Sequence, residues 1–164
     1  MPINKPLRIA IWNANGLSQH TPEILPCLRL QNVDILLISE THFPDRSHFR
    51  VLGYDVYITQ HPDNTAHGGT TIIVRRAIKH HAREEFRQDY LQATSITIQD
   101  EKGALNIAAV YSPPPKHAIG ESDYQRFFQT LGQRFLAGGD YNAKHVAWGA
   151  RVTNTKGRVL YKKP

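Results

Sequence analysis

The chain has 164 residues, which is enough for one domain with a sizeable core, and we expect a single domain over residues 1–164. Hydrophobic residues make up 40% and charged residues 21%, a composition that excludes a disordered chain. The formal net charge of +6 favours a polyanionic partner, nucleic acid first and an anionic membrane second. A basic surface that serves only solubility accounts for this charge equally well.

The cysteine count and the apolar runs indicate the cellular compartment of the protein. A single cysteine, Cys27, excludes an internal disulfide and a cysteine-based zinc framework, and is typical of a reducing compartment. No apolar run approaches the roughly 20 residues that a membrane-spanning helix needs, and the N-terminus lacks a signal-peptide pattern. We therefore expect an intracellular protein without a membrane partner.

The first part of the chain has the pattern of strand, helix, strand. Residues 7–12 and 33–38 are mostly apolar, which predicts two strands that are buried on both faces. Residues 21–32 between them predict a helix, in which Pro22 suits the first turn and Pro26 would shorten or kink the rest. The short joints favour a crossover unit.

Beyond Gly53 short strands dominate. They are predicted at residues 54–58, 69–74, 93–98 and 105–111, with a hairpin turn at 100–103. Residues 121–133 predict a helix with one aromatic face, a short strand follows from Phe135, and residues 155–163 predict a further helix. This mixture indicates an α+β or α/β sandwich.

Polar side chains follow the strand that begins at Phe135. Gly138 and Gly139 remove side chains where the strand stops, and Asp140 and Asn142 come next, two residues apart. In an extended backbone both would project to the same side. A carboxylate beside a carboxamide can bind a hard cation, orient a water or hold a phosphate. An Asp after two glycines is, however, also a common turn residue.

Three strands upstream end in comparable groups. Asn13 and Asn15 follow the first strand, Glu40 follows the second, and Tyr111 ends the strand at 105–111. Catalytic groups gather at strand ends in layered proteins because loops there converge on a shared crevice. Turn formation for the asparagines, a helix cap or surface ion pair for Glu40, and a rim aromatic for Tyr111 are the local alternatives.

Five motifs occur in a fixed order along the chain. They are Trp12-Asn-Ala-Asn-Gly-Leu17, Ser39-Glu-Thr-His42, His67-Gly-Gly-Thr70, Val110-Tyr-Ser-Pro113 and Gly138-Gly-Asp-Tyr-Asn-Ala-Lys-His145. Together they resemble the endonuclease/exonuclease/phosphatase family, which includes DNase I and the apurinic/apyrimidinic endonucleases. With His145-Val-Ala-Trp-Gly149 and Asn154-Thr-Lys-Gly157, two of these motifs resemble more narrowly the endonuclease domain of jockey-type non-LTR retrotransposons. These two are Trp12-Asn-Ala-Asn-Gly16 and Ser39-Glu-Thr-His42. The resemblance runs from Leu7 to about Tyr161.

The resemblance implies a four-layer αββα sandwich of the DNase I-like type, with a phosphodiester-cleaving site at one edge. Family members continue past this point with another strand pair and a Ser-Asp-His motif, whose His acts as general base or stabilises the phosphate. This sequence contains no Ser-Asp-His. We therefore expect a domain that is incomplete at its C-terminal end and weak or inactive alone.

The resemblance also implies roles for individual residues at the metal. Glu40 would ligate a divalent cation, Mg²⁺ or Mn²⁺, with Asn13 or Asn15 close by. Oxygen ligands suit such a hard cation. In some relatives the position of Asn15 is an Asp.

The remaining implied roles concern the phosphate and the attacking water. Asp140 would orient or deprotonate the water, and Asn142 would hold the scissile phosphate. Tyr111 would donate a hydrogen bond to a phosphate oxygen as charge builds on it. Phosphoryl transfer is accelerated mainly by positioning of the reacting groups and by neutralisation of the charge that develops on the phosphate.

As a whole the resemblance implies a Mg²⁺-dependent endonuclease that nicks target DNA in the nucleus and leaves a 3′-hydroxyl to prime reverse transcription. Its partners would be DNA and the reverse transcriptase portion of the same polyprotein. The alternative is a degenerate, non-catalytic module that binds nucleic acid or a partner.

Two basic runs are candidate contacts to DNA phosphates, although a solvated basic face is equally compatible with them. The first comprises Arg75, Arg76, Lys79, His80, His81 and Arg83, of which Arg75, Arg76 and Lys79 are the candidate contacts. The second comprises Lys144, Arg151, Lys156 and Arg158. Trp148 could stack on a base, but we expect it in the core. We expect surface or loop positions for His42, His67, His80 and His81.

Overall fold

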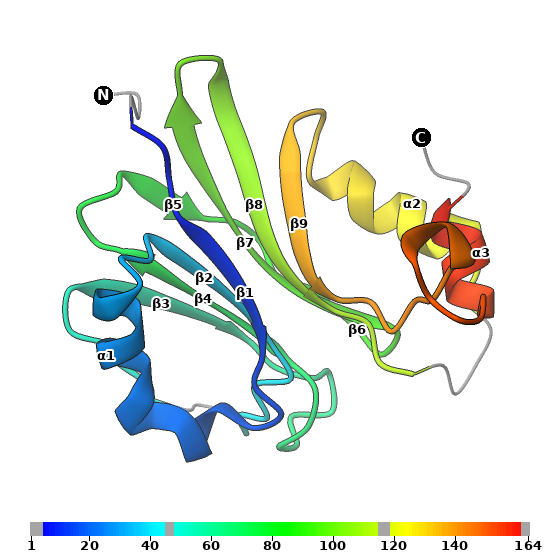
Figure 1. The fold of residues 1–164 in the computed structure, drawn as a ribbon, viewed down its shortest axis with the longest axis horizontal. Helices are drawn as coiled ribbons and strands as arrows, with labels where there is room; N and C mark the ends of the chain where they lie inside the picture. The colour runs from blue at the N-terminus through cyan, green and yellow to red at the C-terminus, as the bar shows by residue number, and fades with distance from the viewer. Residues whose placement is uncertain (1–4, 45–47, 115–118, 162–164) are drawn as a thin grey trace.

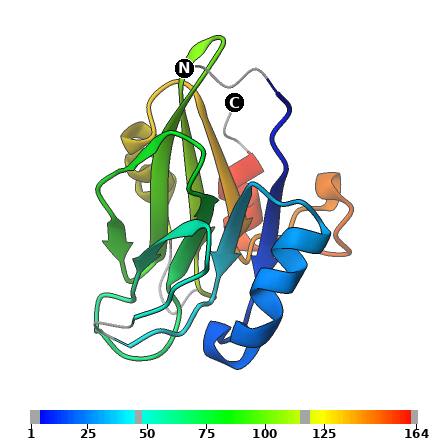
Figure 2. The same cartoon turned by 90° about the vertical axis from the view of Figure 1, so that its left-hand side faces the viewer.

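The computed structural model describes residues 5–44, 48–114 and 119–161, and it contains two mixed sheets that face each other (Figures 1 and 2). The first sheet has the order β1-β2-β4-β3, and the second has the order β5-β7-β8-β9 with β6 paired to β7. The strands of the first sheet are β1 (Ile9–Asn13), β2 (Ile35–Ser39), β3 (Tyr54–Thr59) and β4 (Thr70–Arg75). Those of the second are β5 (His80–Ala82), β6 (Phe86–Gln88), β7 (Leu91–Asp100), β8 (Gly103–Tyr111) and β9 (Phe135–Asp140).

Three apolar clusters lie between four layers. Helix α1 (Thr21–Leu30) packs Ile24 and Leu28 on the outer face of the first sheet. Ile72 and Ile107 belong to the cluster between the two sheets. Helix α2 (Glu121–Thr130) covers the outer face of the second sheet with an aromatic face that includes Phe127. The αββα sandwich expected from the sequence is therefore confirmed.

The two parallel strand pairs bring the predicted site residues to one end of the sandwich. β1 and β2 run parallel, joined by α1, and Asn13 pairs with Ser39 at their carboxyl ends. β8 and β9 are joined by α2 and pair Tyr111 with Asp140 in the same way. β1 and β9 lie at adjacent edges of the two sheets, so the four strand ends meet.

Predicted and observed elements agree except for short pieces. The strands β5 and β6 were not predicted, because three residues are too few to show a period; both form by pairing with the long strand β7. Helix α1 runs through Pro26 and ends at Leu30. Helix α3 (Thr155–Tyr161) lies where residues 155–163 predicted it, and positions 162 and 163 fall outside the described residues.

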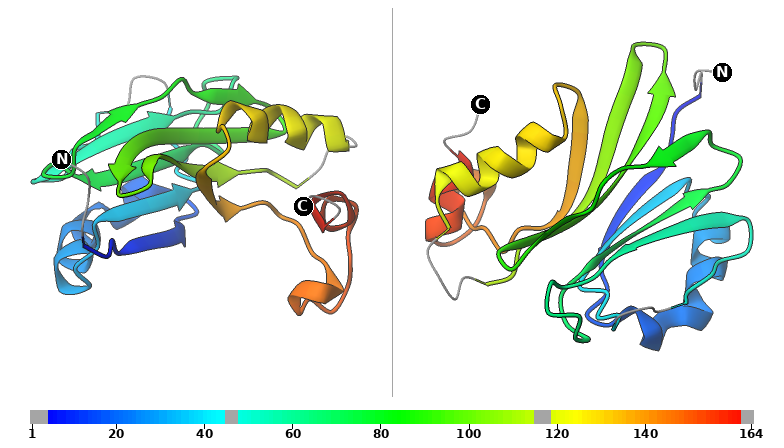
Figure 3. Two further views of the ribbon diagram at one scale, coloured as in Figure 1. Left: turned by 90° about the horizontal axis from the view of Figure 1, so that it is seen from above. Right: turned by 180° about the vertical axis from the view of Figure 1, so that it is seen from behind.

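Several expectations about burial were wrong. The strand expected to be buried on both faces at residues 7–12 is the edge strand β1, and its Ile11 is 55% exposed. Trp148 is 52% exposed, because the segment between β9 and α3 extends away from the sheets, where Trp148 packs against His145 and Tyr161 (Figure 3). The side chain of His80 is 5% exposed rather than on the surface, since its ring nitrogens bond the Tyr57 hydroxyl and the Ile78 carbonyl. None of the described helices is long and apolar enough to cross a membrane.

Candidate active site

The amide of Asn13 joins two carboxylates that belong to different sheets. Its Nδ2 donates to Oε1 of Glu40 at 2.9 Å and to Oδ2 of Asp140 at 2.8 Å. Glu40 follows β2 in the first sheet, whereas Asp140 ends β9 in the second and is 127 residues away from Asn13. One side chain thus fixes the separation of two acidic groups across the sandwich, and the three residues form the centre of a polar site.

Tyr111 adds a buried hydroxyl to the same site. Burial, followed by the negative charges of Glu40 and Asp140 and a hydrogen bond with Glu40, raises the pKa of Tyr111 to about 12. The phenol therefore keeps its proton at neutral pH and remains a hydrogen-bond donor. A donor of this kind beside two carboxylates is suited to an anionic group that is brought in with a cation.

Asn142 is held next to Asp140 by three hydrogen bonds. Its backbone N–H donates to Oδ1 of Asp140 at 2.8 Å, and its Nδ2 donates to the carbonyl of Ser112 at 2.9 Å. The amide of Asn154 donates to the carbonyl of Asn142 at 2.9 Å. Both oxygens of Asp140 thus accept hydrogen bonds, and the loop after β9 is tied to the end of β8 and to the start of α3.

The two glycines before Asp140 are required by close approach of the backbone. A Cβ on Gly139, whose φ is +155°, would lie 1.9 Å from the carbonyl oxygen of Val110 in β8. A Cβ on Gly138 would lie 2.6 Å from Cδ1 of Ile11 in the other sheet. Without side chains here, β9 sits close enough to β8 and β1 for Asp140 to reach Asn13.

Four residues of the site have a left-handed backbone, which side chains other than glycine adopt at a cost. They are Asn15, Glu40, His42 and Asn142, with φ values of 43°, 54°, 57° and 48°. The loop before β4 holds this turn in place, because the carbonyls of Gly69 and Gly68 accept from the N–H groups of Thr41, which follows Glu40, and of His42. The strain lies where the polar side chains converge.

His42 is a site residue that sequence reasoning placed only in a surface loop. Its Nε2 lies 3.6 Å from Oε2 of Glu40, and its side chain is 28% exposed. The signal that would have found it is its spacing, two residues after Glu40 in Ser39-Glu-Thr-His42. A histidine at this distance can orient the carboxylate or contact a bound phosphate.

The donor set fits a hard divalent cation. Glu40 supplies one carboxylate, with Oε1 accepting from Asn13 and Oε2 3.6 Å from Nε2 of His42, and Asp140 supplies a second carboxylate. Asn15 is exposed, two residues after Asn13 on the same loop. Nδ2 of Asn13 donates to both carboxylates, and Oδ1 of Asn13 accepts from the backbone N–H of Asn15 at 3.1 Å. Asn13 therefore bridges Glu40 and Asp140.

Of the second basic run, three residues are exposed, and one of them, Lys144, lines a surface hollow together with Asp140. Lys144, Arg151 and Arg158 lie on the surface of the segment that follows Asn142. Lys156 differs from the expectation: it is 1% exposed, and its Nζ donates to the carbonyls of Ser112, Pro113 and Tyr141 and to the hydroxyl of Ser112. Burial lowers the pKa of Lys156 to about 8. Lys156 is thus an internal support, not an exposed phosphate contact.

The first basic run lies at the opposite end of the sandwich. Arg75 is five strand positions from Thr70, which pairs with Ser39 at the site end, and this corresponds to about 16 Å. Its guanidinium bonds Asp34, and that of Arg76 bonds Asp55. The sheet therefore separates Arg75, Arg76 and the nearby Lys79 from the carboxylates.

A paired-carboxylate site at the strand ends of an αββα sandwich is the arrangement that the sequence resemblance implied. Residues 10–162 match the Endonuclease/Exonuclease/phosphatase family, and the chain belongs to this family. The RNA-directed DNA polymerase from mobile element jockey of Drosophila funebris is 34% identical over 154 residues, which are 94% of this chain and 17% of that protein. The corresponding protein of Drosophila melanogaster transposon BS is 32% identical over 157 residues, with the same coverage.

Solved structures agree on the fold. The endonuclease domain of TRAS1, a telomere-specific non-LTR retrotransposon, superposes with a TM-score of 0.73 at 18% identity, covering 95% of this chain and 68% of that one. The AP endonuclease LMAP from Leishmania major gives a TM-score of 0.68 at 11% identity, covering 96% and 65%. At these identities the likeness shows the fold alone. The chain spans 17% of the length of the curated relatives that it matches.

Proposed function

We propose that this chain is the endonuclease domain of a jockey-like non-LTR retrotransposon, and that it hydrolyses one phosphodiester of target DNA with Mg²⁺ or Mn²⁺. The observation that carries the proposal is the bridge that Asn13 makes between Glu40 and Asp140. It holds a cation ligand and a candidate base at a fixed separation, with a protonated Tyr111 beside them. Membership of the family and the similarity to jockey proteins support the same reaction.

The chain's own residues divide the chemistry between them. Glu40 holds the divalent cation, which supplies neutralising charge to the phosphate when it is bound. Asp140 orients the attacking water and accepts its proton. Tyr111 donates its proton in a hydrogen bond to a phosphate oxygen, where negative charge grows during the attack. Asn142 positions the same phosphate from the side of β9.

The substrate proposal extends to DNA contacts and partners. Lys144, Arg151 and Arg158 are exposed on the β9–α3 segment and are suited to contact phosphates that flank the cut. The domain acts in the nucleus, and the nicked 3′-hydroxyl primes the reverse transcriptase portion of the same polyprotein. We expect slow nicking by the 164 residues alone, since the resemblance implies a Ser-Asp-His motif that this sequence lacks.

The test is a supercoiled-plasmid nicking assay with Mg²⁺, run on the purified chain and on Glu40→Gln and Asp140→Asn. The matched control is Glu101→Gln, which removes one carboxylate at the exposed hairpin turn between β7 and β8. Nicking that the two site variants abolish and the control retains supports the proposal. A folded chain that binds DNA in a salt-sensitive manner but never nicks it is an inert fragment that still recognises DNA, and hydrolysis by these residues alone is then ruled out.

A further inference from the structure

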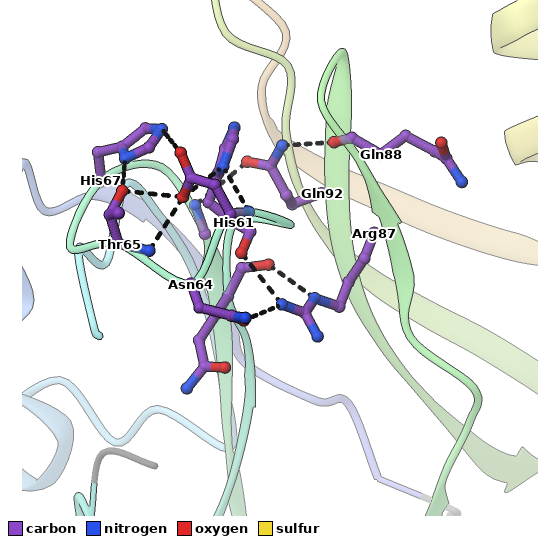
Figure 4. Close-up of polar contacts among 10 residues, drawn as sticks. His61, Asn64, Thr65, His67, Arg87, Gln88 and Gln92 are labelled. Carbon is purple, nitrogen blue, oxygen red and sulfur yellow. Dashed lines mark hydrogen bonds and ion pairs between the residues drawn. The ribbon is translucent and has the colours of Figure 1, made fainter. Parts of the chain in front are cut away.

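A second cluster of ligand-type side chains lies in the loop between β3 and β4. His61, Asp63 and His67 occur within seven residues, and one ligand atom from each lies within 4.8 Å of the others (Figure 4). The loop is at the same end of the sandwich as Glu40, but none of its side chains takes part in the proposed cleavage. We call His61, Asp63 and His67 the loop triad.

The spacing of the triad atoms is that of ligands around one small cation. Nδ1 of His61 lies 3.0 Å from Oδ1 of Asp63, and Nε2 of His67 lies 3.5 Å from Oδ2 of Asp63. A tetrahedral zinc ion with bonds of about 2.0–2.1 Å places neighbouring ligand atoms about 3.3–3.4 Å apart. The imidazole rings of the two histidines lie against each other with centroids 4.0 Å apart, and one nitrogen of each is within 4.8 Å of the other and of an oxygen of Asp63.

Hydrogen bonds around the triad leave the ligand atoms as acceptors. The hydroxyl of Thr65 donates its only proton to Oδ1 of Asp63 at 2.8 Å, so toward Nδ1 of His67 it can only accept. This contact places a proton on Nδ1 of His67, and the neutral ring then presents a lone pair on Nε2. Nδ1 of His61 lies between the backbone N–H of Asp63, at 3.3 Å, and Oδ1 of Asp63, at 3.0 Å, and its neutral tautomer with the proton on Nε2 offers a lone pair there.

The carboxylate between the two rings is held in place by its own loop. The backbone N–H and the hydroxyl of Thr65 both donate to Oδ1 of Asp63, at 2.9 and 2.8 Å. Two imidazole nitrogens and a carboxylate thus face one another, an arrangement that a shared cation satisfies. Orientation of a ligating histidine by a partner on its other nitrogen, as Thr65 does for His67, is typical of metal sites.

The surrounding residues hold the loop in this shape. Arg87 on β6 donates to the carbonyls of Gln60 and His61 at 3.1 and 3.0 Å and to Oδ1 of Asn64 at 2.7 Å. At the other end of the loop, Oε1 of Gln92 accepts from the N–H of Gly69. The triad is therefore fixed from both sides by the second sheet (Figure 4).

We propose that the loop triad is a binding site for a divalent transition-metal ion of the Zn²⁺ class, separate from the Mg²⁺ or Mn²⁺ position at Glu40. Imidazole nitrogen favours zinc-class ions, whereas Mg²⁺ and Ca²⁺ prefer oxygen ligands. His67 and Asp63 are about half exposed, at 51% and 49%, so the fourth position is open to a water molecule.

The occupied triad stabilises the loop that supports Glu40. The carbonyls of Gly68 and Gly69, directly after His67, accept from the N–H groups of His42 and Thr41. These bonds belong to the strained turn that contains Glu40. A cation bound by the triad binds only the folded state of the chain and therefore stabilises it. At a free concentration 100-fold above its Kd, the cation is expected to raise the Tm by about 5 °C or more.

The test is calorimetric titration of the metal-free chain with ZnCl₂, without DNA or Mg²⁺. The variants are Asp63→Asn, whose Oδ1 can still accept from Thr65, and His67→Gln at a half-exposed position. The matched control is His81→Gln, an exposed histidine on β5. We expect one Zn²⁺ per wild-type chain, and at least about tenfold weaker binding in both triad variants but not in the control.

Two further measurements separate this site from the proposed cleavage site. Glu40→Gln is expected to leave Zn²⁺ binding intact while it abolishes nicking, so the two proposals can fail independently. Co²⁺ in place of Zn²⁺ is expected to give the visible absorption of a tetrahedral site in the wild type and not in Asp63→Asn. Equal Zn²⁺ affinity in wild type and both triad variants, with native circular dichroism in each, overturns the proposal, as does loss of binding in Glu40→Gln.

Discussion

The Glu40–Asp140 site and the loop triad lie at the same end of the sandwich but are built in opposite ways. The first joins side chains up to 127 residues apart, and its donors are oxygens and amides. The second is contained in residues 61–67, and two of its three donors are imidazoles. The first therefore exists only when both sheets are in place, whereas the second depends on one loop and the arginine that braces it. The oxygen donors of the first site favour a hard cation such as Mg²⁺, whereas the imidazoles of the loop triad favour a borderline cation such as Zn²⁺.

The largest difference between the two sites is expected when the carboxylates of the Glu40–Asp140 site are neutralised. Glu40→Gln and Asp140→Asn are each expected to lower the nicking rate about 10³-fold, because a cation ligand or the candidate base is lost. Zn²⁺ binding by the loop triad is expected to stay unchanged. Parallel nicking and calorimetric measurements check this pair of outcomes. A variant that keeps more than a tenth of wild-type nicking would remove that residue from the proposed machinery.

The next largest effect is expected from a substitution that disturbs the Glu40–Asp140 site without removing a polar group. In Gly139→Ala, the new Cβ would meet the Val110 carbonyl, so we expect a loss of about 3 kcal/mol or more in the free energy of unfolding. Gly149→Ala is the control, since Gly149 also has a positive φ, +84°, but nothing lies within 4 Å of a Cβ there. About 1 kcal/mol is expected for it. Urea unfolding measures both, and equal losses would show that strain alone, not close approach, requires Gly139.

The sequence predicted the long-range site better than the local one. Asn13, Glu40, Tyr111 and Asp140 were found because each directly follows or ends an apolar strand, and parallel strands end on the same side. The hydrogen bonds between them could not be predicted, because they depend on how β1 and β9 approach across the two sheets. His61, Asp63 and His67 have no such strand signal. Their convergence depends on a loop conformation that Arg87 fixes from another sheet.

Burial was the property that sequence patterns predicted least well. Lys156 was grouped with exposed basic residues because it lies among Lys144, Arg151 and Arg158, yet it alone is buried. Its helix, α3, turns this face toward the ends of β8 and β9, where several carbonyls require a donor. Charge clustering in a sequence gives no information about which member faces inward.

Lys156 gives a smaller, pH-dependent effect at the junction of the long-range site. Its pKa is about 8 in the folded chain against 10.5 for a free lysine, so above pH 8 the unfolded state binds more protons. The free energy of unfolding should therefore rise from pH 8 to 9, where the unfolded tyrosines are still mostly protonated. Lys156→Met is expected to flatten this rise and to cost about 1–3 kcal/mol at pH 7, because the carbonyls of Ser112 and Tyr141 lose their donor. Urea unfolding at several pH values checks it, with the exposed Lys102→Met as control.

The smallest effects concern DNA binding, and they compare the two ends of the sandwich. Lys144→Ala, close to Asp140, or Arg151→Ala on the same segment is expected to weaken DNA binding a few-fold and to reduce the slope of log affinity against log salt by about 1. Arg76→Ala, at the far end and paired with Asp55, is expected to change neither quantity. Fluorescence anisotropy with a short duplex at several salt concentrations measures both. A slope change in Arg76→Ala equal to that of Lys144→Ala would mean that DNA reaches around the sheets to the far end, and the contact surface would then include the first basic run.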